Sequence, residues 1–162
     1  MQELKLGGLM FGIVVLGGSV IADNFDITGV NRQGTNMVVS FPGSSTSYYK
    51  VAVSSALNTG SWSVATMEVG ANQSMSMTNG VAVNARFYQI RRALLTDSGD
   101  EDADGIDDVW ELLNSLNPLN AADAAQDGDS DGLSNFQEYD NGSLITNSDS
   151  NTNEVPDGWD TY

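Results

Sequence analysis

The chain has 162 residues, enough for one domain or two small ones, and it contains no cysteine and no histidine. This composition excludes disulfides, thiolate or imidazole metal sites and catalytic pairs that depend on either residue. The formal net charge is −16, with 18 of the 22 acidic residues between Asp97 and Asp160 and all six basic residues at or before Arg92. Phosphate binding needs a basic patch, so this charge argues against nucleic acid as a partner.

The first 22 residues combine a short polar start with a 17-residue apolar run, residues 6–22. The arrangement is similar to a secretory signal peptide, with cleavage after Ala22. The run is at the short limit for a membrane span, and its five glycines weaken it as a helix. Three interpretations stay open: a cleaved signal peptide, a retained apolar segment buried in an assembly, and a membrane anchor through residues 6–22.

Residues 23–95 show a hydrophobic period of two, interrupted about every ten residues by turn sequences such as PGSSTS and NTGS. The pattern predicts a small antiparallel β-sandwich of six or seven strands. The alternating apolar positions are Phe25, Ile27, Met37, Val39, Phe41, Tyr49, Val51, Val53, Trp62, Val64, Met75, Met77, Tyr88 and Ile90.

This strand pattern resembles the fibronectin-III-like and immunoglobulin-like modules of secreted bacterial proteins. The resemblance implies a fold but no particular activity. Tyr49 and Trp62 are expected in the core, whereas Tyr48, Lys50 and Phe87 are the better candidates for an exposed face that contacts a polysaccharide.

Residues 96–162 contain three twelve-residue stretches in one register: DEDADGIDDVWE from Asp100, DGDSDGLSNFQE from Asp127 and DSNTNEVPDGWD from Asp149. Each has Asp or Asn at positions 1, 3, 5 and 9, an aliphatic residue at position 7 and a carboxylate at position 12. The alternative is a disordered, solvated acidic tail. Such a tail would not keep the register three times, so the spacing indicates an internal repeat.

The spacing suits calcium, which takes about six to eight oxygen ligands. A tight loop directs side chains 1, 3 and 5 at one point, and the sharp turn at position 6 favours Gly105 and Gly132. Position 7 offers a backbone carbonyl, position 9 reaches the ion directly or through water, and a glutamate at position 12 closes the shell. Magnesium demands a smaller octahedron and keeps its waters, so we expect calcium.

The loops resemble thrombospondin type 3 repeats and, more distantly, EF-hand and dockerin loops. The resemblance implies a first site of Asp100, Asp102, Asp104, Ile106, Asp108 and Glu111, and a second of Asp127, Asp129, Asp131, Leu133, Asn135 and Glu138. The third loop departs from the pattern with asparagines at positions 3 and 5 and a glutamate at position 6. Its candidate ligands are Asp149, Asn151, Asn153, Val155, Asp157 and Asp160. We expect two Ca²⁺ sites, with the third loop as a further candidate.

Short helices are expected behind the first two loops. Asp107 and Asp108 suit the first turn of one helix, which ends before Pro118, and NFQEY from Asn135 predicts the other. Asp123 is expected at a helix N-terminus rather than as a ligand. The expected apolar contacts of this region are Val109, Trp110, Leu112, Leu113, Leu116, Phe136, Tyr139 and Trp159.

These features predict a mainly β fold: a small antiparallel β-sandwich followed by a calcium-stapled region of loops and short helices. We expect a secreted, extracellular or cell-surface structural protein of bacterial type that forms a homo-oligomer or polymer and whose acidic repeats are made rigid by Ca²⁺. The alternative is a calcium-stabilised adhesion or polysaccharide-binding module. No enzyme is expected, because no nucleophile–base pair, phosphate loop or catalytic metal site is visible.

Overall fold

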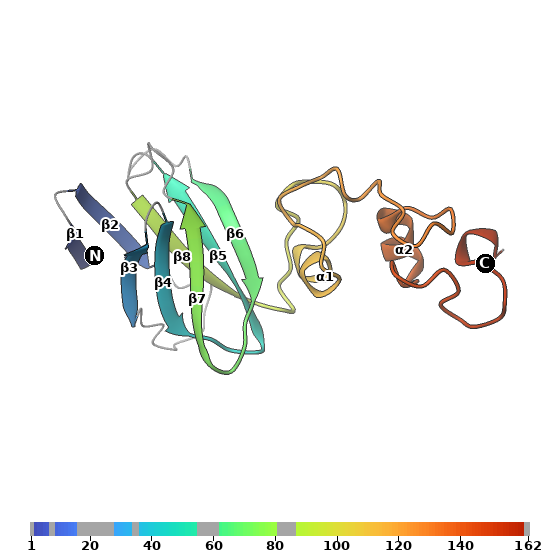
Figure 1. The fold of residues 1–162 in the computed structure, drawn as a ribbon, viewed down its shortest axis with the longest axis horizontal. Helices are drawn as coiled ribbons and strands as arrows, with labels where there is room; N and C mark the ends of the chain where they lie inside the picture. Colours follow the sequence, from blue (N-terminus) through green and yellow to red (C-terminus); the bar gives the residue numbers. More distant parts are fainter. Residues whose placement is uncertain are drawn as a thin grey trace. The chain divides into compact units, whose positions relative to one another are not determined.

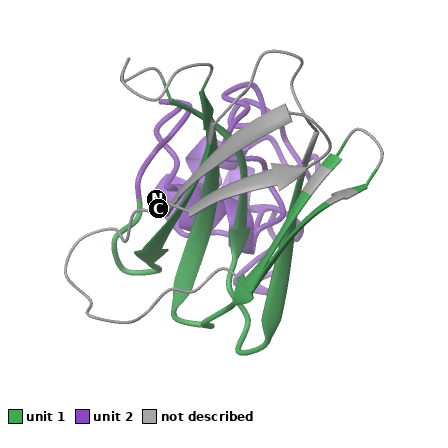
Figure 2. Ribbon diagram, turned by 90° about the vertical axis from the view of Figure 1, so that its left-hand side faces the viewer, with its two compact units in different colours: residues 1–98 green, residues 99–162 purple. Residues whose placement is uncertain are grey.

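The computed structural model describes residues 2–6, 9–15, 28–33, 36–54, 62–80 and 87–160. The chain forms two compact units, residues 1–98 and residues 99–162 (Figure 2). The fold is mainly β, with two sheets in the first unit and two short α-helices in the second (Figure 1). The predicted fold class is therefore confirmed.

The first unit contains two sheets. The larger sheet has the strand order β1 (Gln2–Leu6), β2 (Leu9–Val15), β8 (Phe87–Leu94), β5 (Ser47–Ser54) and β6 (Ser63–Val69). The smaller sheet has the order β3 (Gly29–Gln33), β4 (Asn36–Pro42) and β7 (Ser74–Gly80). All neighbouring strands are antiparallel except β2 and β8, which pair in parallel.

The core lies between the two sheets, because alternate residues of β4 and β7 meet alternate residues of β5 and β8. Phe41 and Tyr49 make a direct contact between the sheets, with ring centroids 4.7 Å apart. Eight of the predicted core positions are buried in this cluster: Val39, Phe41, Tyr49, Val51, Met75, Met77, Tyr88 and Ile90. The period-two prediction is confirmed for these residues.

Two aromatic residues differ from expectation. Tyr48 was expected on an exposed face, but it is buried, with 2% of its surface exposed. Its hydroxyl donates to the backbone oxygen of Asp97, and the Lys50 ammonium lies 5.4 Å from its ring centroid, so the second face of β5 is covered as well. Trp62 is only partly buried rather than a core residue, and the side chain of Phe87 lies outside the described residues.

The N-terminal segment is described in part. Residues 2–6 and 9–15 form an antiparallel hairpin, and the second strand continues the larger sheet beside β8. None of the helices in the described ranges has the length and apolar character needed to span a membrane. Phe25, Ile27 and the proposed cleavage site at Ala22 lie outside the described residues. The three interpretations of residues 1–22 stay predictions.

The second unit contains helices α1 (Asp108–Leu113) and α2 (Asn135–Asn141) and a 3₁₀ turn, η1 (Asp157–Trp159). Ser134 and Gln137 form a capping box at the start of α2, and Gly142 ends the helix in the left-handed conformation. Trp110 packs edge-on against Tyr139, with centroids 5.1 Å apart, and so joins the two helices.

Both helices were expected, but their apolar stripes are less buried than predicted. Helix α1 ends at Leu113, four residues before Asn117, so Leu116 is not part of it. Leu113 is 63% exposed, Phe136 41% and Trp159 77%, which corrects the expectation that these side chains are covered. The unit has little apolar surface to bury them against, as its interior is occupied by carboxylates.

Candidate metal centre

The three acidic loops share one backbone conformation. In each loop the N–H of position 6 donates to the carboxylate of position 1, and the N–H of position 7 donates to the side-chain oxygen of position 5. The position 6 bonds are 3.1, 3.1 and 2.9 Å long, and each position 7 bond is 2.8 Å long. The register read from the sequence is therefore a structural repeat.

Positive φ angles recur at two positions of each loop. Position 6 has φ of 97° at Gly105 and 103° at Gly132, as the sharp turn requires, and 72° at Glu154 in the third loop. Position 4 was not predicted to be left-handed, yet φ is 62° at Ala103 and 67° at Ser130, and Thr152 is similar. The same turn is thus imposed on residue types that do not favour it, at a local conformational cost.

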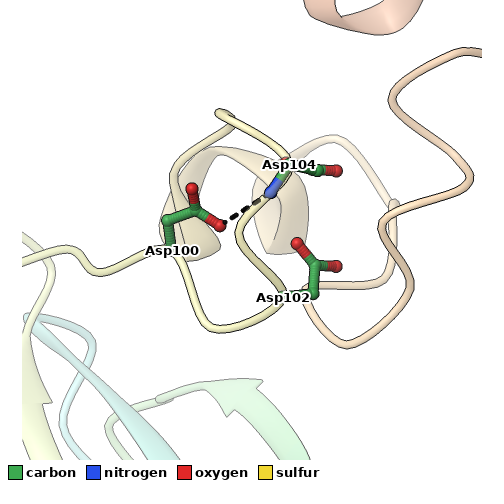
Figure 3. Close-up of side chains that lie close together, drawn as sticks. All are labelled: Asp100, Asp102 and Asp104. Carbon is green, nitrogen blue, oxygen red and sulfur yellow. Dashed lines mark hydrogen bonds between the residues drawn. The ribbon is translucent and has the colours of Figure 1, made fainter.

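The first loop gathers its odd-numbered side chains. Asp100, Asp102 and Asp104 each place a carboxylate oxygen within 4.8 Å of the other two, and all three project from the same turn of chain (Figure 3). Asp100 also accepts from the Asp104 backbone N–H at 3.2 Å. Burial and the neighbouring Asp104 raise the pKa of Asp102.

Glu111, at position 12 of the first loop, reaches the same place from helix α1. One of its carboxylate oxygens lies within 4.8 Å of an oxygen of Asp104. The side chain is fully buried, and neither carboxylate oxygen has a hydrogen-bond partner among the described residues. Burial first, and then Asp102 and Asp104, raise the pKa of Glu111 to about 8. A buried carboxylate of this kind is stable either when it is protonated or when a cation lies beside it.

The second loop repeats the arrangement. Asp127, Asp129 and Asp131 lie within 4.8 Å of one another. Glu138, from helix α2, is fully buried with both carboxylate oxygens unpartnered among the described residues. Burial and the nearby Asp129 raise its pKa to about 7. The asparagine that replaces aspartate at position 9, Asn135, is buried too, and donates to the backbone oxygen of Asp123 at 2.8 Å.

In the first and third loops, the carboxylate at position 9 accepts hydrogen bonds from the backbone of its own loop. Asp108 accepts from the Glu101 backbone N–H at 2.8 Å, and Asp157 accepts from the Ser150 backbone N–H with both oxygens. Neither aspartate belongs to the close carboxylate groups found among the described residues. Their role as ligands, and that of the position 7 carbonyls at Ile106, Leu133 and Val155, stays a prediction.

Asp123 was not expected to join the site, but the structure places it there. One of its oxygens lies within 4.8 Å of oxygens of Asp104 and Glu111. The side chain is 6% exposed, Oδ2 accepts from the Asn117 backbone N–H, and Oδ1 has no partner in the described part of the chain. Asp123 lies outside the twelve-residue register, so the repeat did not predict it as a ligand. Its signal in the sequence was that of an isolated aspartate between two loops.

The third loop brings its polar side chains together differently. The Asn151 and Asn153 side-chain amides both donate to Asp160 Oδ2, at 2.8 and 2.9 Å. No group of three close carboxylates is found in this loop within residues 149–160. The candidate ligands named for the third loop therefore stay a prediction without the geometric support that the first two loops have.

The second unit concentrates acidic side chains without any basic side chain of its own. Residues 99–162 contain no lysine or arginine, so no ion pair within the unit can neutralise its acids. Among its described residues, the buried carboxylates are Asp108, Glu111, Asp123, Asp131, Glu138 and Asp157, whereas the buried apolar residues are Ile106, Val109, Pro118, Ala124 and Ile145. Oxygen donors in this density fit a hard divalent cation such as Ca²⁺.

Comparison with known proteins does not assign a family. No family model matches the chain, and no match was found among curated proteins or among solved structures.

Proposed function

We propose that this chain is an extracellular, calcium-binding structural protein whose residues 99–162 are folded and made rigid by two Ca²⁺ ions. The observation that carries the proposal is the pair of buried glutamates, Glu111 and Glu138, whose carboxylate oxygens have no hydrogen-bond partner in the part of the chain that the structure describes. Each lies at the same position of a repeated loop that gathers three aspartates. Such a site holds its charge only when a cation is bound.

The chemistry of the ligands supports calcium. Clustered carboxylates in each of the first two loops, in a chain that contains no histidine or cysteine, suit a hard ion with flexible coordination. Calcium-binding modules of extracellular proteins bind with dissociation constants of roughly 10⁻⁴–10⁻³ M. An outside location, where calcium is permanently high, agrees with such affinities.

A role in assembly is supported by apolar side chains on the surface of the second unit. They are Leu113, Phe136, Leu144, Val155 and Trp159, each between 38% and 77% exposed. Contact with another surface would remove these apolar side chains from water, which favours association. We propose that copies of this chain supply that surface in a filament or another polymer once Ca²⁺ has ordered the loops.

Sedimentation and electron microscopy of the full chain, with calcium, with magnesium and with chelator, test this proposal. We expect polymers with calcium and monodisperse protein in the other two conditions. The double change Leu113→Ser and Leu144→Ser is expected to reduce assembly while leaving calcium binding intact, because both side chains are exposed. Monomeric protein at every calcium concentration would contradict the assembly role.

A second candidate function is that of a calcium-stabilised adhesion or polysaccharide-binding module. Trp159 favours it, because an indole that is 77% exposed can stack on a sugar ring or on an apolar partner. The burial of Tyr48 removes one candidate from the sandwich for the same task. A glycan array probed with calcium-loaded protein distinguishes the candidates, and binding that is lost in Trp159→Ser would favour this second one.

A further inference from the structure

A carboxylate from outside the repeat joins the first loop. Asp123 lies in the segment between the first and second loops, yet one of its oxygens is within 4.8 Å of oxygens of Asp104 and Glu111. Asp123 Oδ1 is unpartnered in the described part of the chain, although the side chain is more than nine-tenths buried. Both Glu111 oxygens and Asp104 Oδ2 are also buried and unpartnered among the described residues, and each of these three residues places one oxygen within 4.8 Å of the other two.

In the second loop, no carboxylate from another segment joins a close group among the described residues, although the charge of Asp157 also acts on Glu138. Its close carboxylate group consists of Asp127, Asp129 and Asp131, with Glu138 beside it. The first loop therefore offers five carboxylates and the second offers four. Calcium affinity in loop sites is set largely by the number of charged ligands and by the rigidity of the site.

We infer that Asp123 is a calcium ligand of the first site and makes it the tighter of the two sites, so that the sites fill in order. The inference rests on the proposed calcium function and extends it. Hydrogen bonds from two other segments help to hold Asp123 in place: the Asn117 backbone N–H donates to Oδ2 at 2.9 Å, and the Asn135 amide donates to the Asp123 carbonyl oxygen at 2.8 Å. Asn135 belongs to the second loop, so filling the first site positions part of the second.

The order of filling is measured on the unmodified protein. Gly105 and Gly132 occupy the same position of their loops, and their N–H groups make matching 3.1 Å bonds to Asp100 and Asp127. Their amide resonances therefore report each site separately during a calcium titration followed by NMR. We expect the Gly105 resonance to reach its bound position at a lower calcium concentration than that of Gly132. Simultaneous or reversed filling would overturn the inference.

The ligand itself is tested in a protein with one working site. In a Glu138→Gln background, Asp123→Asn is expected to weaken the remaining calcium site by about tenfold, because one charged ligand becomes neutral. The asparagine oxygen can still accept from Asn117, which preserves the turn. The matched control is Asp140→Asn, an exposed position in helix α2, with less than a twofold effect expected.

The two hypotheses fail in different ways. If Asp123→Asn has no more effect than Asp140→Asn while Glu111→Gln removes the site, Asp123 is not a ligand but the calcium function stands. If calcium binds neither the unmodified protein nor the Glu138→Gln variant, the proposed function itself is wrong.

A separate observation concerns the third loop. Asp160 Oδ2 accepts from both the Asn151 and the Asn153 amides, which closes the centre of the loop. The orientation of both amides is fixed, because Asn151 Oδ1 accepts from the Asn153 N–H and Asn153 Oδ1 accepts from the Val155 N–H. The nitrogens, not the oxygens, therefore face the position 12 carboxylate.

We propose that the third loop binds no ion of its own and acts as a positioning element for the second site. The Asn151 and Asn153 amide N–H groups donate hydrogen bonds to the Asp160 carboxylate, and these bonds take the place that a cation would have at position 12 of the other two loops. The Gly158 backbone N–H donates to Asp131 Oδ2 at 3.0 Å, and so holds a ligand of the second site from the next loop. Gly158 is required there, because a Cβ would lie 2.4 Å from the Asp131 carbonyl oxygen.

Counting bound calcium by equilibrium dialysis tests this second proposal. We expect two ions for the unmodified chain and three for the double variant Asn151→Asp and Asn153→Asp, in which the amide donors become ligands. Asn141→Asp, an exposed position outside the loops, is the control and should keep two ions. Three ions in the unmodified chain, or only two in the double variant, would overturn the proposal.

Discussion

Removal of calcium is expected to unfold residues 99–162 and to leave the β-sandwich intact. The first unit has a continuous apolar core between its sheets, formed by residues such as Phe41, Tyr49 and Ile90, and it contains no acidic cluster in its described part. Among its described residues, the second unit buries six carboxylates and, besides Pro118, four apolar side chains. Without a cation, those carboxylates must protonate or return to water, and the second course unfolds the unit.

The free energy involved is large for so small a unit. Each site saturated at about 100 times its dissociation constant contributes about 2.7 kcal/mol to stability, and two sites contribute about twice that. The buried apolar side chains Ile106, Val109, Ala124 and Ile145 cannot replace this contribution, because the chain entropy of ordering each residue is about 1–2 kcal/mol.

Hydrogen exchange with mass spectrometry separates the two units within one sample. In chelator we expect rapid exchange throughout helices α1 and α2 and slow exchange in β4, β5 and β8. Calcium should restore protection in the helices, whereas an equal concentration of magnesium should not. Unchanged protection of the α2 amides in chelator at neutral pH would show that the unit folds without a metal, against the proposed function.

The repeat could be predicted from the sequence because the conformation of each loop is set by interactions between residues that are close in sequence. An aspartate at position 1 of a loop accepts backbone N–H groups a few residues on, and a glycine at position 6 adopts the positive φ that follows. Both interactions are local, so the spacing alone is enough to predict them. The positive φ at Ala103, Ser130 and Thr152 was missed, because these residue types carry no signal for it.

Asp123 and Tyr48 could not be placed from the sequence for a different reason. Asp123 meets Glu111 only because the chain turns back after Pro118, and that turn is fixed by the bond between Asp123 and the Asn117 N–H itself. Tyr48 points away from the core by the period of the strand, and is buried because Asp97 and Lys50 cover it. Long-range contacts of single side chains leave no periodic pattern.

The structure of the N-terminal apolar run could not be predicted from the sequence either. Its apolar composition is compatible with a signal peptide, an assembly segment or a membrane anchor, and composition does not distinguish among them. The pairing of β2 with β8 was not expected, because parallel neighbours distant in sequence produce no local signature. A glycine-rich apolar stretch of this kind can form strands as well as a helix.

Replacement of Glu111 or Glu138 by glutamine is expected to abolish one calcium site each, with a loss of affinity of about 100-fold or more. Changes in the outer shell of metal sites already cost about 10–100-fold, and these glutamates are argued to bind the ion directly. A loss of 100-fold corresponds to about 2.8 kcal/mol. The matched control is Glu154→Gln, which removes the same charge from an exposed position of the third loop and should change affinity less than twofold.

The two glutamine variants also distinguish direct binding of the ion by these glutamates from an effect of the net charge of the unit. If the sites act only by relieving the charge of the acidic unit, Glu154→Gln and Glu111→Gln should have equal effects, since both change the net charge by one. If Glu111 holds the ion, calorimetry should show one site in Glu111→Gln, one in Glu138→Gln and none in the double variant, with two in Glu154→Gln. The calorimetric count therefore depends on buried, unpartnered oxygens rather than on charge, and equal behaviour of all three single variants would refute the assignment of both glutamates.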